Sequence, residues 1–129
     1  MRAGMVGLLM VLLLCGAASV FAQNKDLDGT WVGETIVPNS PDKDVITMVL
    51  KKAGDSYTGT MSDSLGMLNG TPLTKVKFEN GTLSFELVAL ADGQEIRVIT
   101  TLKVSGEKLA GSWETEDGAN GLLEMSRVK

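Results

Sequence analysis

The chain has no histidine and only one cysteine, Cys15, among its 129 residues. Without an imidazole it can form neither a Ser-His-Asp triad nor a histidine-containing metal site, and it lacks the commonest general acid and base. The sequence also contains no P-loop and no dinucleotide-binding fingerprint. These absences argue against an enzyme, and we expect no cofactor.

Residues 1–22 have the composition of a secretory signal peptide. Arg2 supplies a positive charge, residues 6–14 are apolar, and residues 20–22 end in small-residue cleavage chemistry. The apolar stretch is shorter than the roughly 20 residues that a membrane-spanning helix needs. We therefore expect cleavage after Ala22, no membrane span, and an exported domain of residues 23–129 that is periplasmic or extracellular.

Cys15 allows a second interpretation of the leader. The segment Leu-Leu-Leu-Cys-Gly resembles the box of bacterial lipoproteins, in which the cysteine carries a lipid. That box requires a small residue just before the cysteine, and Leu14 is not small, so full removal of the leader is favoured over a lipid anchor at Cys15. The exported domain would then contain no cysteine and would be held together by its core alone.

Basic side chains are the minority among the charged residues. Loss of Arg2 with the leader leaves 11 basic against 16 acidic side chains, a net charge of −5. An acidic domain is a poor partner for nucleic acids or anionic membranes. We therefore expect no nucleic-acid partner, and nothing in the sequence indicates the oligomeric state.

Beyond residue 28 the dominant pattern is alternation of apolar and polar residues, interrupted by turn residues every 8–12 positions, which is typical of all-β proteins. The strongest turn signal is Asn80-Gly81, which predicts a two-residue type I′ hairpin. Short connections force neighbouring strands to pair antiparallel, and closure of the sheet removes its exposed edges. We predict an eight-stranded antiparallel up-and-down β-barrel with strands at about 30–37, 45–52, 56–62, 73–79, 82–90, 95–104, 108–115 and 121–128.

The predicted inward positions indicate how much room the barrel contains. An eight-stranded barrel is either just filled by its side chains or open enough for one small ligand. Most inward positions carry large side chains such as Trp31, Phe85 and Trp113. The pattern therefore favours a filled or nearly filled interior.

Gly29-Thr30-Trp31 at the start of the first strand, together with Arg127 in the last, resembles the calycin pattern shared by lipocalins, fatty-acid-binding proteins and avidins. The chain is also similar to small secreted bacterial proteins with lipocalin-like barrels of uncharacterised function. The resemblance implies that Trp31 lies at the closed end of the barrel and that Arg127 packs across its ring. The ligand-binding residues of those families have no match here, so the resemblance implies no particular ligand.

Two functions remain open from the sequence. The first is a non-catalytic barrel that binds a small apolar ligand at its open end, with Phe85, Val98, Trp113 and the loop residues Leu65, Met67 and Leu68 as candidates. The second is a protein-interaction module, such as a periplasmic protease inhibitor acting on an envelope protein through residues 23–27 or 62–71. The acidic residues at 114–117 lack the ligand spacing of an EF-hand, so no metal site is predicted.

Overall fold

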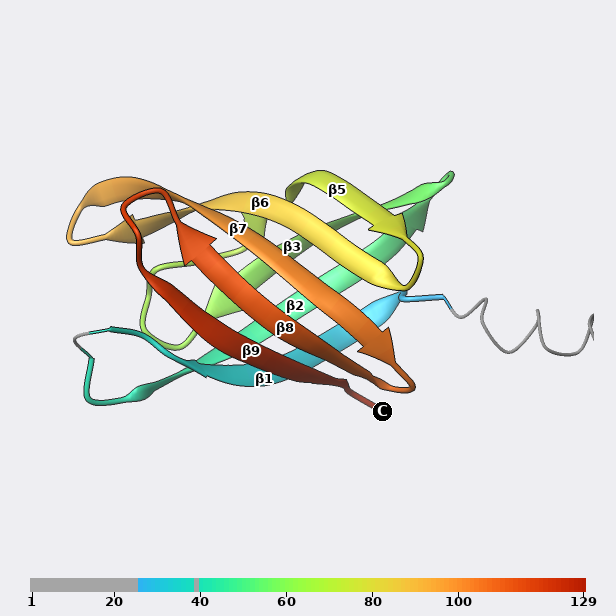
Figure 1. Ribbon diagram of the computed structural model, residues 1–129, viewed down its shortest axis with the longest axis horizontal. Helices are drawn as coiled ribbons and strands as arrows, with labels where there is room; N and C mark the ends of the chain where they lie inside the picture. The colour runs from blue at the N-terminus through green and yellow to red at the C-terminus, as the bar shows by residue number, and fades with distance from the viewer. Residues whose placement is uncertain (1–25, 39) are drawn as a thin grey trace, which may run out of the picture.

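The computed structural model describes residues 26–38 and 40–129. The predicted signal peptide and Cys15 lie outside these residues, so cleavage and lipid attachment stay predictions. No helix within the described ranges is long and apolar enough to cross a membrane. The domain is instead one antiparallel sheet that curls into a nearly closed barrel, which confirms the predicted fold class (Figure 1).

The sheet has nine strands, one more than predicted, in the order β4-β3-β2-β1-β9-β8-β7-β6-β5. The two ends of the domain are therefore neighbours, because β1 pairs with β9 through Trp31 opposite Arg127 and Gly33 opposite Met125. The strands are β1 (Gly29–Ile36), β2 (Lys43–Ala53), β3 (Ser56–Asp63), β4 (Thr71–Pro72), β5 (Thr74–Glu79), β6 (Thr82–Ala91), β7 (Gln94–Ser105), β8 (Lys108–Thr115) and β9 (Asn120–Arg127).

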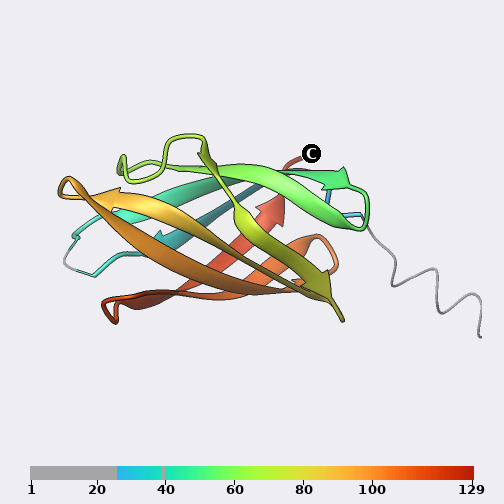
Figure 2. The same ribbon diagram turned by 90° about the horizontal axis from the view of Figure 1, so that it is seen from above.

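The additional strand arises because the predicted strand 73–79 is divided. β4 pairs with β3, the backbone N–H of Leu73 donates to the carbonyl of Gly59 at 3.0 Å, and the chain then crosses to pair with β6 as β5. The crossing is marked by Lys75, whose φ of 50° is unusual for a residue with a side chain, and by a shift in the register of β5 against β6. This segment lies over the seam between β3 and β6 (Figure 2).

The loop between β3 and β4 closes the rest of the seam. The carbonyl of Met67 accepts a hydrogen bond of 2.9 Å from the N–H of Leu90 on β6, and the carbonyl of Leu68 accepts one of 3.1 Å from the N–H of Asp63 on β3. The loop therefore links β3 to β6, which satisfies backbone groups that an open seam would expose.

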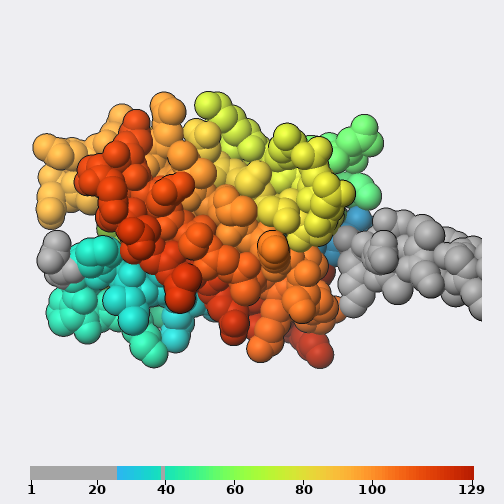
Figure 3. All heavy atoms as spheres, in the orientation of Figure 1, coloured from blue at the N-terminus to red at the C-terminus, as the bar shows by residue number. Residues whose placement is uncertain are grey.

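The predicted hairpin at Asn80-Gly81 is present between β5 and β6. Both residues have positive φ, 52° and 76°, which is the backbone conformation that a type I′ turn requires. The β2–β3, β5–β6 and β7–β8 hairpins all lie at one end of the barrel, and the loops that follow β1, β3, β6 and β8 lie at the other (Figure 1). On the face shown in Figure 3, the side chains of β7, β8 and β9 pack side by side.

The hairpin end of the barrel is closed by Trp31, which is fully buried. Its indole Nε1 donates to the carbonyl of Leu27 at 3.0 Å, and the N–H of Leu27 donates to the hydroxyl of Tyr57 at 2.9 Å. Arg127 covers the ring, with its guanidinium carbon 4.5 Å from the ring centroid. Gly29 has a φ of 132°, and a side chain on it would press against the Arg127 guanidinium. The structure thus brings Gly29, Trp31 and Arg127 together.

The interior is filled only toward this closed end. Fully buried side chains from several strands pack there, and they include Trp31, Met48, Leu83, Phe85, Leu102 and Leu109. The prediction of a filled or nearly filled interior is wrong for the opposite end, which contains a cavity. Smaller inward residues such as Ala89 and Thr100 line that end, and the large side chains of the closed end do not reach it.

Candidate functional site

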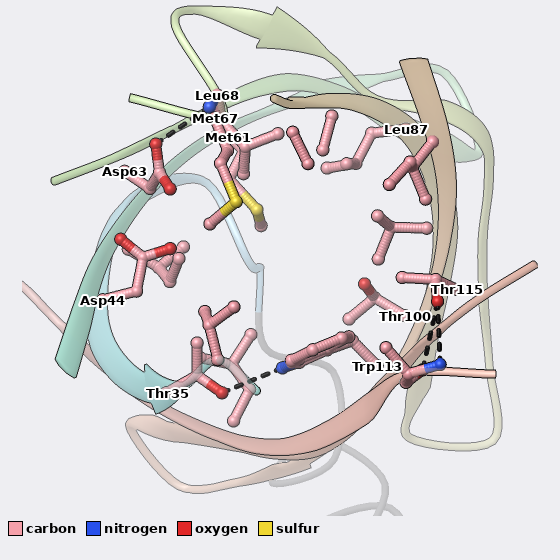
Figure 4. Close-up of a pocket in the computed structure, with 18 of the residues that line it drawn as sticks. Thr35, Asp44, Met61, Asp63, Met67, Leu68, Leu87, Thr100, Trp113 and Thr115 are labelled. Atoms are coloured by element: carbon pink, nitrogen blue, oxygen red, sulfur yellow. Dashed lines mark hydrogen bonds between the residues drawn. The ribbon is translucent and has the colours of Figure 1, made fainter. Parts of the chain in front are cut away.

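The open end of the barrel encloses a cavity of about 320 Å³. Its walls come from inward residues of β1, β2, β3, β6, β7, β8 and β9 and from the loops at that end (Figure 4). Most of the lining is aliphatic or sulfur-containing, and it includes Ile46, Met61, Met67, Leu68, Leu87, Ala89, Ile96, Val98 and Leu123. The volume lies at the lower end of the range of small-molecule sites, roughly 300–1,000 Å³.

Four of the six ligand-binding candidates from the sequence line this cavity. They are Val98 on β7, Trp113 on β8, and Met67 and Leu68 on the loop that closes the seam. Met67 and Leu68 reach the cavity because their backbone carbonyls are held between β3 and β6, which turns the loop inward.

The other two candidates lie elsewhere. Phe85 is 1% exposed and packs in the filled half of the barrel, because β6 meets the cavity only from Leu87 onward. Leu65 is 38% exposed on the outer side of the loop and does not line the cavity. Neither residue is in a position to contact a molecule inside the cavity.

Trp113 is fixed in the wall by a chain of two hydrogen bonds. Its indole Nε1 donates to the hydroxyl of Thr35 at 2.8 Å, and that hydroxyl donates to the carbonyl of Leu122 at 2.6 Å. Thr35 therefore uses both its acceptor and its donor capacity to join β8, β1 and β9. The ring also lies directly against Gly121, where an added Cβ would come within 2.7 Å of it. The indole is consequently held as one fixed side of the cavity.

Two carboxyl groups, Asp44 and Asp63, lie on the same wall (Figure 4). Asp44 is only 2% exposed, and its Oδ1 accepts hydrogen bonds from the N–H and hydroxyl of Ser64 and from the N–H of Leu65, at 3.1–3.3 Å. Oδ1 of Asp63 accepts a 2.8 Å hydrogen bond from the N–H of Leu68, whereas its Oδ2 is buried without a partner. Burial, and next the neighbouring Asp63 carboxyl, raise the pKa of Asp44 to about 6.

The alternating pattern contains one signal for the two aspartates, which are absent from the candidates predicted from the sequence. Asp44 continues the inward series of Ile46 and Met48 one step toward the start of β2, and Asp63 continues the series of Tyr57 and Met61 one step beyond the predicted end of β3. The predicted strands 45–52 and 56–62 each end one residue short of the aspartate. Thr35 lies within the predicted strand 30–37, at an inward position of β1.

The site is a cavity with an aliphatic lining, one fixed indole and two neighbouring carboxyl groups. Among the described residues, no three acidic or cysteine side chains converge on a point where they could hold a metal ion. No protein-family model matches the sequence, and no curated protein is significantly similar to it.

Proposed function

We propose that the protein is an exported, non-catalytic barrel of the calycin type that binds a small, largely apolar ligand in the cavity at its open end. One observation carries the proposal: the barrel is packed solid around Trp31 but leaves about 320 Å³ open beside Trp113, within an aliphatic lining. An apolar surface of this kind is favourable for a ligand because binding removes apolar area from water.

The calycin assignment is supported by the closed end. A tryptophan at the start of β1 lies under an arginine from the last strand, and the order of the strands makes these two strands neighbours. Export is supported by the leader-like composition of residues 1–22.

The described parts of the segments 23–27 and 62–71 give less support to a role as a protein-interaction module. Leu27 is fully buried beneath Trp31, and Leu68 is buried against the cavity, so these apolar side chains face the barrel and not a partner protein. The cavity, in contrast, is a concave, largely apolar surface whose volume suits a small molecule.

The proposal is tested by filling the cavity. Ala89 lines it and is 8% exposed, so Ala89→Leu would place a larger apolar side chain in the space. Ala110→Leu is the matched control, because Ala110 lies on the outer face of β8. We expect a dye that brightens in apolar surroundings to bind the natural protein and Ala110→Leu, and to bind Ala89→Leu much more weakly.

Native mass spectrometry of the purified protein gives a second readout, since a retained ligand would add a discrete mass. A dye that binds all three proteins equally would contradict binding in the cavity. Absence of both dye binding and a retained ligand would contradict the proposed function as a whole.

A further inference from the structure

The charged groups in the cavity wall are all of one sign. Four aspartates line the cavity, Asp44, Asp63, Asp92 and Asp117, and the described residues contribute no lysine or arginine to the lining. The nearest cation on β2, Lys43, points outward, where its ammonium lies 3.7 Å from the carboxylate of Glu34. A cavity with low-dielectric walls concentrates such a field, so it attracts cations and repels anions.

Within this wall Asp44 is buried, and Asp63 is partly buried with its Oδ2 atom shielded from water. Their carboxyl groups come from adjacent strands and lie within hydrogen-bonding reach of each other. Donors from the protein satisfy Oδ1 of each aspartate, but none of the described residues provides a donor for the buried Oδ2 of Asp63. A buried acceptor without a donor costs about 1–3 kcal/mol, and more when it is charged.

The pair therefore needs either a proton or a positive partner. Below about pH 6 a proton on Asp44 serves this purpose, since its pKa is raised by burial and by the Asp63 carboxyl. Above that pH Asp44 brings a negative charge next to the Asp63 carboxyl, and no lysine or arginine among the described lining residues compensates it. A cationic donor brought in by a ligand would relieve both the repulsion and the missing hydrogen bond.

We infer that the cavity selects ligands with a protonated amine on an apolar body, the amine lying against the carboxyl groups of Asp44 and Asp63. The apolar body would lie against Met61, Leu87 and Val98, which line the cavity with these two aspartates. This inference rests on the proposed function and adds the chemical class of the ligand.

A divalent cation fits this wall less well than an amine. Calcium takes six to eight oxygen ligands, and magnesium requires a nearly ideal octahedron. Oδ1 of both aspartates already accepts hydrogen bonds from the protein, and no third carboxyl group among the described residues joins the pair. An ammonium group, with three donors and one charge, needs far fewer acceptors.

The test compares octylamine, octanol and octanoate, which share one apolar chain and differ in the head group. Octylamine is protonated at neutral pH, as a lysine side chain is. Binding is measured by calorimetry at pH 7.5 on the natural protein and on Asp63→Asn, which keeps an oxygen for the N–H of Leu68 but removes the charge. Asp117→Asn removes the same charge from the mouth of the cavity and is the matched control.

We expect octylamine to bind more tightly than octanol and octanoate to bind most weakly. Asp63→Asn should weaken octylamine binding roughly tenfold or more, the usual effect of losing a hydrogen bond to a charged group, and should leave octanol binding unchanged. Asp117→Asn should change octylamine binding by less than about twofold, as expected for an exposed charge. Thermal unfolding of each variant verifies that it is folded, and Asp44→Asn replaces Asp63→Asn if the latter does not fold.

Equal binding of octylamine and octanol, unaffected by Asp63→Asn, would overturn the inference and leave the proposed function intact. Preferred binding of octanoate would also overturn it. If none of the three compounds and no apolar dye binds, the proposed function fails and the inference fails with it.

Discussion

Arg127 lies across the indole of Trp31, with its guanidinium carbon 4.5 Å from the ring centroid. The same guanidinium donates to the carbonyls of Asp26, at 2.7 Å, and Asp28, and its Nε donates to the carboxylate of Glu107 at 2.6 Å. One side chain from the last strand therefore holds both the ring and the segment that leads into β1. The contact stabilises the place where the two ends of the sheet meet.

Replacement of Trp31 tests whether this end is the centre of the core. Trp31 is fully buried, so Trp31→Ala should lower the free energy of unfolding by about 3–5 kcal/mol through lost burial and a residual void. Urea denaturation at neutral pH measures the change. A loss below about 1 kcal/mol would mean that the ring contributes little to the packed core.

Replacement of Arg127 separates its hydrogen bonds from its charge. Arg127→Ala should lower the free energy of unfolding by roughly 1–3 kcal/mol, because backbone carbonyls lose charged donors and the ring loses its cation–π partner. Arg127→Lys should recover only part of this loss, because an ammonium cannot reproduce the planar set of donors.

Lys108→Ala is the control for the loss of a cation from the same barrel. Lys108 is an exposed residue whose ammonium lies 3.9 Å from the Glu124 carboxylate, so its removal should cost less than about 1 kcal/mol. If urea denaturation shows the same loss in the free energy of unfolding for Lys108→Ala and Arg127→Ala, the contacts of Arg127 stabilise the fold no more than an exposed ion pair does.

Asp44 should make the protein less stable as the pH rises from about 4 to 6. Its folded-state pKa of about 6 lies above the ordinary value of 3.8, so the folded protein binds this proton more tightly than the unfolded chain does. Ionisation of Asp44 in the folded protein lowers the free energy of unfolding. This loss is absent at low pH, grows as the pH approaches 6 and is constant above it. Asp44→Asn should gain stability relative to the natural protein across this interval.

Denaturation of both proteins at a series of pH values measures the difference. The titratable group that faces Asp44 is Asp63, and it is present in both proteins. Asp117→Asn provides a control of opposite sign, because a hydrogen bond from Thr115 lowers the pKa of Asp117 and its contribution is lost as the pH falls. A stability difference for Asp44→Asn that does not change with pH would contradict the prediction.

Gly121 provides a test of the wall formed by Trp113. In Gly121→Ala the new methyl group would come within 2.7 Å of the indole, which must move toward the cavity and away from Thr35. We expect a loss of about 1–3 kcal/mol from overpacking, together with weaker binding of octanol. Asn120→Ala changes the adjacent exposed residue and should affect neither quantity.

Local chemistry explains which parts of the fold could be predicted. Asn80-Gly81 specifies its hairpin because both residues tolerate positive φ, and the alternation along β2 and β7 specifies which side chains face inward. Prediction of the contact between Trp31 and Arg127 needs one further assumption. It is that an antiparallel meander closes into a barrel.

The features that were not predicted depend on tertiary structure. Lys75 takes a positive φ because the chain must pass from β3 to β6 there, and nothing about a lysine indicates such a position. Asp44 and Asp63 lie just outside the predicted strands, since aspartate is a poor strand residue, and only the pairing of β2 with β3 brings them to one wall. The cavity depends on how far each large side chain reaches, as the position of Phe85 demonstrates.

The chain has two tryptophans, and the barrel places them in unlike surroundings: Trp31 is fully buried under a guanidinium, and Trp113 is partly exposed beside the open volume. Each indole is thus an intrinsic optical probe for a different event. The emission of Trp31 should change when the barrel unfolds, and that of Trp113 when the cavity is occupied. Replacement of Trp113 by phenylalanine, with Trp31 kept in the packed core, would leave an indole that reports unfolding and not occupancy, without any attached label.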